Sequence, residues 1–168
     1  LGALHRDQGS LDAAEKHFLE SLSVARPFDM GFHIANSTVG LAQVLWLKGD
    51  REAAQQQAEL SLKLAVELGV KETLVEAYRL KAEMQMEAQV WNEAKASAMQ
   101  ALEYADALGN RGWQASLWRL ISELELRRGE QNAAQAAFDK ACEALTDATD
   151  ALEVGRTKVQ ASRLAYAK

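Results

Sequence analysis

The sequence of 168 residues has little of several features that define particular protein classes. It contains one cysteine and one proline, which excludes a disulfide framework and a collagen-like or low-complexity chain. Valine and isoleucine number only 9 and 2, and this scarcity of β-branched residues disfavours a sandwich or barrel. The strong helix formers alanine and leucine number 31 and 23. The composition therefore predicts an all-α protein.

An excess of basic charge is also missing. Lys and Arg number 19 against 24 Asp and Glu, and the charges are interspersed, so we expect no nucleic-acid contact by this segment. We expect no membrane association either, because no apolar run approaches the roughly 20 residues of a membrane span. The first ten residues, LGALHRDQGS, do not resemble a signal peptide. A lone cysteine fits a reducing compartment, which predicts a cytoplasmic location.

A repeat with a period of 40 residues runs through the chain. Its main column is alanine, and four other columns share that step, five residues before it and four, seven and eight residues after it. The alanine column is Ala14, Ala54, Ala94 and Ala134, and the preceding column is Gly9, Gly49, Gln89 and Gly129. The following columns are Phe18, Ala58, Ala98 and Phe138, then Ser21, Ser61, Ala101 and Ala141, then Leu22, Leu62, Leu102 and Cys142. Duplication of one structural unit explains this agreement.

Each unit is predicted to be a helical hairpin, because glycine near its middle and at its end stops a helix. The expected helices are 1–8, 10–26, 32–48, 50–68, 71–88, 91–108, 111–128, 130–147 and 151–167. We expect one irregular connector, residues 26–31, where Pro27 and Asp29 suit a turn. The prediction is a single repeat domain over 1–168, with units 1–30, 31–70, 71–110, 111–150 and a partial unit 151–168.

These columns resemble the tetratricopeptide repeat over essentially the whole chain. Leu1-Gly2-x2-His5 is similar to the start of its pattern, and Ala14-x3-Phe18 and Ala134-x3-Phe138 match its middle. The chain departs from the pattern where Ala58 and Ala98 replace the aromatic residue and Gln89 replaces glycine, and its period is 40 rather than 34. The resemblance implies a right-handed superhelical solenoid of antiparallel helix pairs, whose first helices line a concave groove that binds proteins or peptides.

The longer period is similar to the repeat arrays of large bacterial signalling proteins, such as maltose-activator-type transcription regulators and cyclase-associated arrays. This implies an alternative function, an effector-sensing region of a larger signalling ATPase, cyclase or transcription regulator. A start at Leu1 and 4.2 repeat periods predict a piece of a longer protein. Neither end reads as a polar cap, so we expect further repeats or self-association through the terminal helices.

The sequence contains no motif typical of catalysis or of cofactor binding. Phosphate-binding glycine loops are absent, and His5, His17 and His33 do not stand at metal-ligand spacings. Cys142 falls in a leucine column, so we interpret it as a packing residue. We therefore expect no cofactor and no enzymatic activity, and predict a scaffold.

The predicted groove residues come from the inward positions of each first helix. They are Asn36, Gln43, Trp46, Arg79, Glu83, Met86, Arg119 and Glu123. Because Arg79 and Arg119 are one period apart, they could grip a partner that carries carboxylates. The alternative is that Arg79–Glu83 and Arg119–Glu123 are ion pairs on a solvated face. Trp46 and Met86 are either the floor of a groove or core between repeats.

Overall fold

The computed structural model describes residues 10–145, 157 and 159–161, and the secondary structure of these residues is helical. The elements are α2 (Leu11–Ala25), the 3-10 helix η1 (Arg26–Phe28), α3 (Gly31–Lys48), α4 (Arg51–Leu68), α5 (Lys71–Glu87), α6 (Trp91–Ala107), α7 (Arg111–Arg127) and α8 (Gln131–Leu145). The predicted helix positions between residues 10 and 147 are confirmed, because each helix begins and ends within two residues of its predicted bounds. The predicted helix 1–8 lies outside the described residues, as does most of 151–167.

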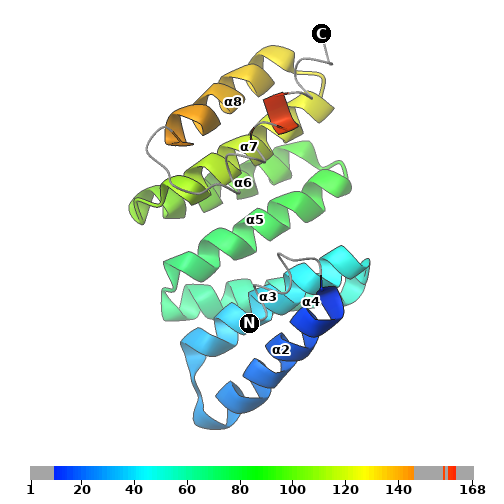
Figure 1. The fold of residues 1–168 in the computed structure, drawn as a ribbon, viewed down its shortest axis with the longest axis vertical. Coiled ribbons are helices and arrows are strands. Elements are labelled where there is room, and N and C mark those ends of the chain that lie inside the picture. The colour runs from blue at the N-terminus through cyan, green and yellow to red at the C-terminus, as the bar shows by residue number, and fades with distance from the viewer. Residues whose placement is uncertain (1–9, 146–156, 158, 162–168) are drawn as a thin grey trace. The chain divides into compact units, whose positions relative to one another are not determined.

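The chain divides into two compact units, Leu1–Leu80 and Lys81–Lys168. In the first unit α2 packs on α3 and α3 on α4, and in the second α6 packs on α7 and α7 on α8. Successive helices within each unit run in opposite directions (Figure 1). The all-α architecture of antiparallel helix pairs is therefore confirmed, while a single domain over 1–168 stays a prediction.

Six helix-to-helix turns share one backbone geometry at intervals of 20 residues. In each turn one residue has a positive φ, and these residues are Asp29, Gly49, Gly69, Gln89, Gly109 and Gly129. The N–H of the residue that follows donates to the carbonyl five positions earlier, at 2.9 to 3.1 Å in all six turns. This pair of features is the Schellman ending of a helix, and the following residue begins the next helix. The turn geometry therefore repeats twice as often as the sequence does.

Two of these turns differ from what the sequence indicates. The connector 26–31 was expected to be irregular, but Arg26–Phe28 form a 3-10 helix and Asp29, at a φ of 50°, ends it in the common geometry. Gln89 replaces glycine and yet has a φ of 60°. Both residues adopt a conformation that is costly for any residue with a Cβ atom, because the backbone hydrogen bonds of the turn require it.

The alanine column lies where paired helices touch. Ala14, Ala54, Ala94 and Ala134 are all fully buried, which confirms the prediction that small residues at this column permit close approach. Beside this column, the Phe18 ring of α2 lies directly over Gly40 of α3, where even a methyl group would overlap it. Both units thus bury the first turn of each second helix, and this packing sets the positions of the first helices.

Candidate binding face on the first helices

The predicted groove residues lie on the first helices of three repeats, α3, α5 and α7. Asn36, Gln43, Trp46 and Arg79 belong to the first unit, and Glu83, Met86, Arg119 and Glu123 belong to the second. We describe each unit separately, starting with the polar contacts between α3 and the first half of α5.

A carboxylate organises the predicted face of the first unit. Glu76 Oε2 accepts hydrogen bonds from Gln43 Nε2 at 2.5 Å and from an Arg79 terminal nitrogen at 3.0 Å. Gln43 is only 4% exposed, whereas the Glu76 and Arg79 side chains keep 24% and 22% of their surface. The buried amide therefore fixes the carboxylate, which in turn orients a guanidinium that a partner can reach. Gln43 has a positioning role rather than an open surface for contact.

A second contact joins the same two helices. Thr73 is fully buried, and its hydroxyl donates to Asn36 Oδ1 at 3.1 Å. Asn36 itself is exposed, so this bond holds an amide group at the surface in a defined orientation. Asn36 and Arg79 are thus the two predicted residues of this unit that combine exposed polar groups with a fixed position.

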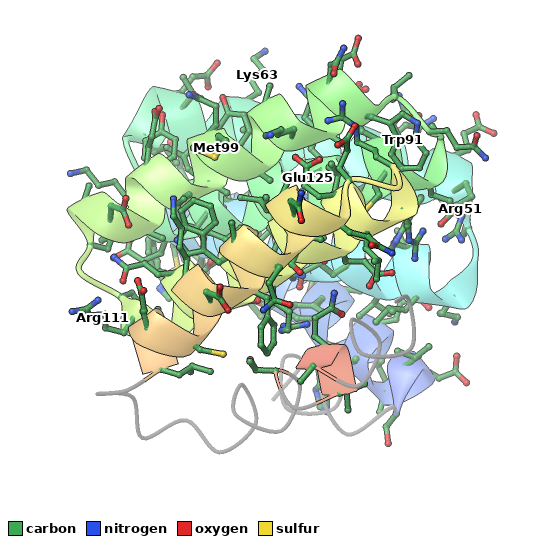
Figure 2. The ribbon with its side chains drawn as sticks, turned by 90° about the horizontal axis from the view of Figure 1, so that it is seen from above. Arg51, Lys63, Trp91, Met99, Arg111 and Glu125 are labelled. Carbon is green, nitrogen blue, oxygen red and sulfur yellow. The ribbon has the colours of Figure 1, made fainter. Side chains whose placement is uncertain are left out.

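Trp46 is half-buried, and a side chain that the prediction omitted lies over it. The Arg51 guanidinium, at the start of α4, stacks at 3.7 Å from the ring centroid, and its nitrogen also donates to the Trp46 carbonyl oxygen (Figure 2). This cation–π contact covers one ring face. The spacing Trp46–Arg51 across the Gly49 turn was the sequence feature that could have indicated it.

In the second unit the predicted residues differ in burial. Met86 is 8% exposed and packs with Ala94, Leu124 and Trp91, so of its two interpretations the core between helices is favoured. Glu123 is half-buried and accepts from Arg127 Nε at 3.0 Å. Because α5 and α7 bury their apolar residues against α6, the polar residues between those positions remain at the surface.

The arginine of this unit and its partners complete the predicted set. Arg119 is half-buried, with a terminal nitrogen 3.4 Å from Ser116 Oγ, and Glu83 is half-buried on α5. In the first unit Arg79 pairs with Glu76, three residues earlier. The pairs Arg79–Glu83 and Arg119–Glu123 stay predictions.

Sequence reasoning missed the most buried carboxylate of the described chain. Glu125 on α7 is 2% exposed, with Lys95 Nζ of α6 at 2.6 Å and an Arg128 nitrogen at 3.4 Å (Figure 2). The ion pair with Lys95 joins α6 to α7. Leu45 stands two periods before Glu125, and this column could have indicated a buried position.

The described residues offer no group of three or more His, Cys, Asp or Glu side chains that could hold a metal ion. Cys142 is half-buried, and burial, together with the charge of Asp139, raises the pKa of its thiol. A raised pKa lowers the thiolate fraction, so the thiol is a weak nucleophile at neutral pH. His17 contacts Glu20 at 3.2 Å, and His5 lies outside the described residues. Within the described part of the chain, no helix is long and apolar enough to cross a membrane.

Comparison with known proteins supports the repeat. Residues 1–65 match the family model described as tetratricopeptide repeat. The crystal structure of BtubC (BKLC) from P. vanneervenii superposes with a TM-score of 0.79 at 19% identity, over 99% of this chain and 70% of that one. No curated protein matches the sequence. At this identity the structural likeness shows the fold alone. The chain therefore has an all-α solenoid fold of the tetratricopeptide type, and residues 1–65 carry the sequence pattern of that family.

Proposed function

We propose that this chain is a non-catalytic scaffold that binds a protein or peptide through the first helices of its repeats. The tetratricopeptide match over residues 1–65 supports a role in protein–protein interaction, because solenoids of this type use extended surfaces for partner binding. The proposed contact residues are the exposed and half-buried members of the predicted set.

The observation that carries this proposal is the Gln43–Glu76–Arg79 network of the first unit. A guanidinium that is already oriented loses less conformational entropy when it binds than a free arginine side chain does. Arginine presents its donors in a planar fork that fits carboxylates. The proposed partner is therefore a segment with acidic side chains or a free C-terminal carboxylate, which Arg79 contacts while Asn36 bonds to its backbone.

An array of random dodecapeptides with free C-terminal carboxylates tests this proposal directly. We expect the chain to select acidic peptides, and the Arg79→Glu and Arg119→Glu variants to bind the best of them at least ~10-fold more weakly, which corresponds to about 1.4 kcal/mol. Fluorescence anisotropy measures each affinity.

Lys63→Glu provides the matched control, because it makes the same charge change on the exposed face of a second helix, α4. It should leave the affinity within about twofold of the parent chain. Selection of no peptide, or an equal loss in the control and in the Arg79 variant, would show that the first helices are not the binding face.

A further inference from the structure

Large apolar side chains gather at one end of the first unit. Val24, Phe28, Met30 and Phe32 lie around the turn from α2 to α3, and Phe28 and Val24 are 75% and 63% exposed. Leu68 joins them from the end of α4, because a Cβ atom on Gly31 would stand 2.9 Å from its Cδ1. These five residues, here called the turn patch, form an apolar surface from two elements that are far apart in sequence.

The turn patch lies where this turn differs from the equivalent turn of the second unit. There Asn110 begins α7, and its side chain accepts a hydrogen bond from the Trp113 N–H at 3.0 Å. Met30 begins α3 at the same position of the repeat and provides no such side-chain bond. An apolar residue at a helix N-cap gives up about 1 kcal/mol of helix stability. Neither the exposed Phe28 nor the uncapped Met30 is explained by packing within the unit.

The charges around the turn patch indicate which partner fits it. Arg26 and Lys71 are exposed on its rim, and so are Asp29, Glu67 and Glu72. This mixture of signs does not suit an anionic membrane surface or a strongly charged partner. It does suit a second copy across a twofold axis, because each basic group of one rim can then face an acidic group of the other.

We infer that two copies of this chain associate through their turn patches. The surface lies on internal residues 24–32 and 68, not on the proposed peptide-binding face, so this inference is independent of the proposed function. Burial of the two phenylalanines and of Met30 supplies the apolar centre, and the rim charges provide the surrounding polar contacts.

Sedimentation velocity of the full 168-residue chain over a concentration series tests this inference. We expect the parent chain to approach twice its 18.5 kDa mass as its concentration rises. The double variant Phe28→Glu/Met30→Glu should remain at the monomer mass at every concentration, because four buried carboxylates would then meet at the interface. Glu130 begins α8 at the position of Met30, so the fold accepts glutamate there.

Leu47→Glu is the matched control, because Leu47 is also exposed but lies about 22 Å from Phe32 along α3. This variant should associate as the parent chain does, and circular dichroism should give the same helix content for all three proteins. A parent chain that stays monomeric would overturn the inference. So would association that survives Phe28→Glu/Met30→Glu or that is lost in Leu47→Glu.

Discussion

The junction of α2 with α3 in the first unit and that of α6 with α7 in the second place different residues at equivalent positions. In the first unit the large Phe18 meets Gly40. Two periods later, the corresponding residues are Ala98 and Leu120, and Leu120 packs against the cluster that contains Ala98. The large side chain has moved from the second helix to the first helix, while the junction stays filled. The repeat thus preserves the combined volume of the two residues rather than either residue.

The same two junctions also differ in their ion pairs. Lys48 of α3 contacts Asp12 and Glu15 of α2 at 2.7 Å each, and Asp12 is almost fully exposed. At the second junction Lys95 reaches the buried Glu125. An exposed pair contributes little stability, whereas loss of one partner of a buried pair leaves a carboxylate without compensation.

The largest effect is expected where the first junction loses its aromatic ring. Phe18→Ala would leave a void over Gly40 and should lower the free energy of unfolding by about 3 kcal/mol. Ala98→Phe, the reverse change at the second junction, should destabilise by about 2 kcal/mol, because Leu120 already fills that space. Urea unfolding followed by circular dichroism measures both changes. A loss below ~0.5 kcal/mol in both variants would contradict complementary filling.

A smaller effect is expected at the buried ion pair. Lys95→Gln should cost about 2 kcal/mol, since Arg128 remains as a second cation near Glu125. The double variant Lys95→Gln/Glu125→Leu introduces the residues of the first unit, Gln55 and Leu45, and should regain most of that loss. If the double variant were less stable than Lys95→Gln in thermal unfolding, the ion pair would be worth more than apolar packing here.

The turns test whether geometry or residue type is repeated. Gln89→Gly should raise the free energy of unfolding by about 1 kcal/mol, because glycine adopts a positive φ without steric cost. Gly129→Ala, at an equivalent turn with a φ of 80°, should lower it by a similar amount. Differential scanning calorimetry should show melting temperatures that move in opposite directions by roughly 2–4 °C. Shifts of the same sign would show that the two turns are not equivalent.

The smallest effect concerns Asp12. The hydrogen bond and the positive charge of Lys48 lower the pKa of the Asp12 carboxyl. A lowered folded-state pKa stabilises the fold above the unfolded value, near ~3.9, and this contribution is lost as the pH falls below it. In Lys48→Met the Asp12 pKa should rise toward its ordinary value, as carboxyl NMR titration can measure. An unchanged pKa would show that Lys48 does not hold Asp12 in solution.

Helix positions were predictable because glycine punctuation and the alanine columns are local patterns in the chain. The turn at Gln89 was not, because a backbone set by hydrogen bonds carries no mark in a residue that usually avoids it. Phe18 and Gly40 are 22 positions apart, so their contact depends on how two helices pack. Helix periodicity likewise placed Arg79 correctly on a first helix, but it could not distinguish the reachable Arg79 from the buried Gln43.

A double-mutant cycle at Phe18 and Gly40 tests the central claim, that junction volume is shared between facing residues, most directly. Gly40→Leu alone should destabilise by about 2 kcal/mol, because its side chain would overlap the Phe18 ring. Phe18→Ala/Gly40→Leu reproduces the arrangement of the second junction and should be at least about 2 kcal/mol more stable than the sum of the single changes predicts. Additive losses in urea unfolding, with a coupling below ~0.5 kcal/mol, would contradict the claim.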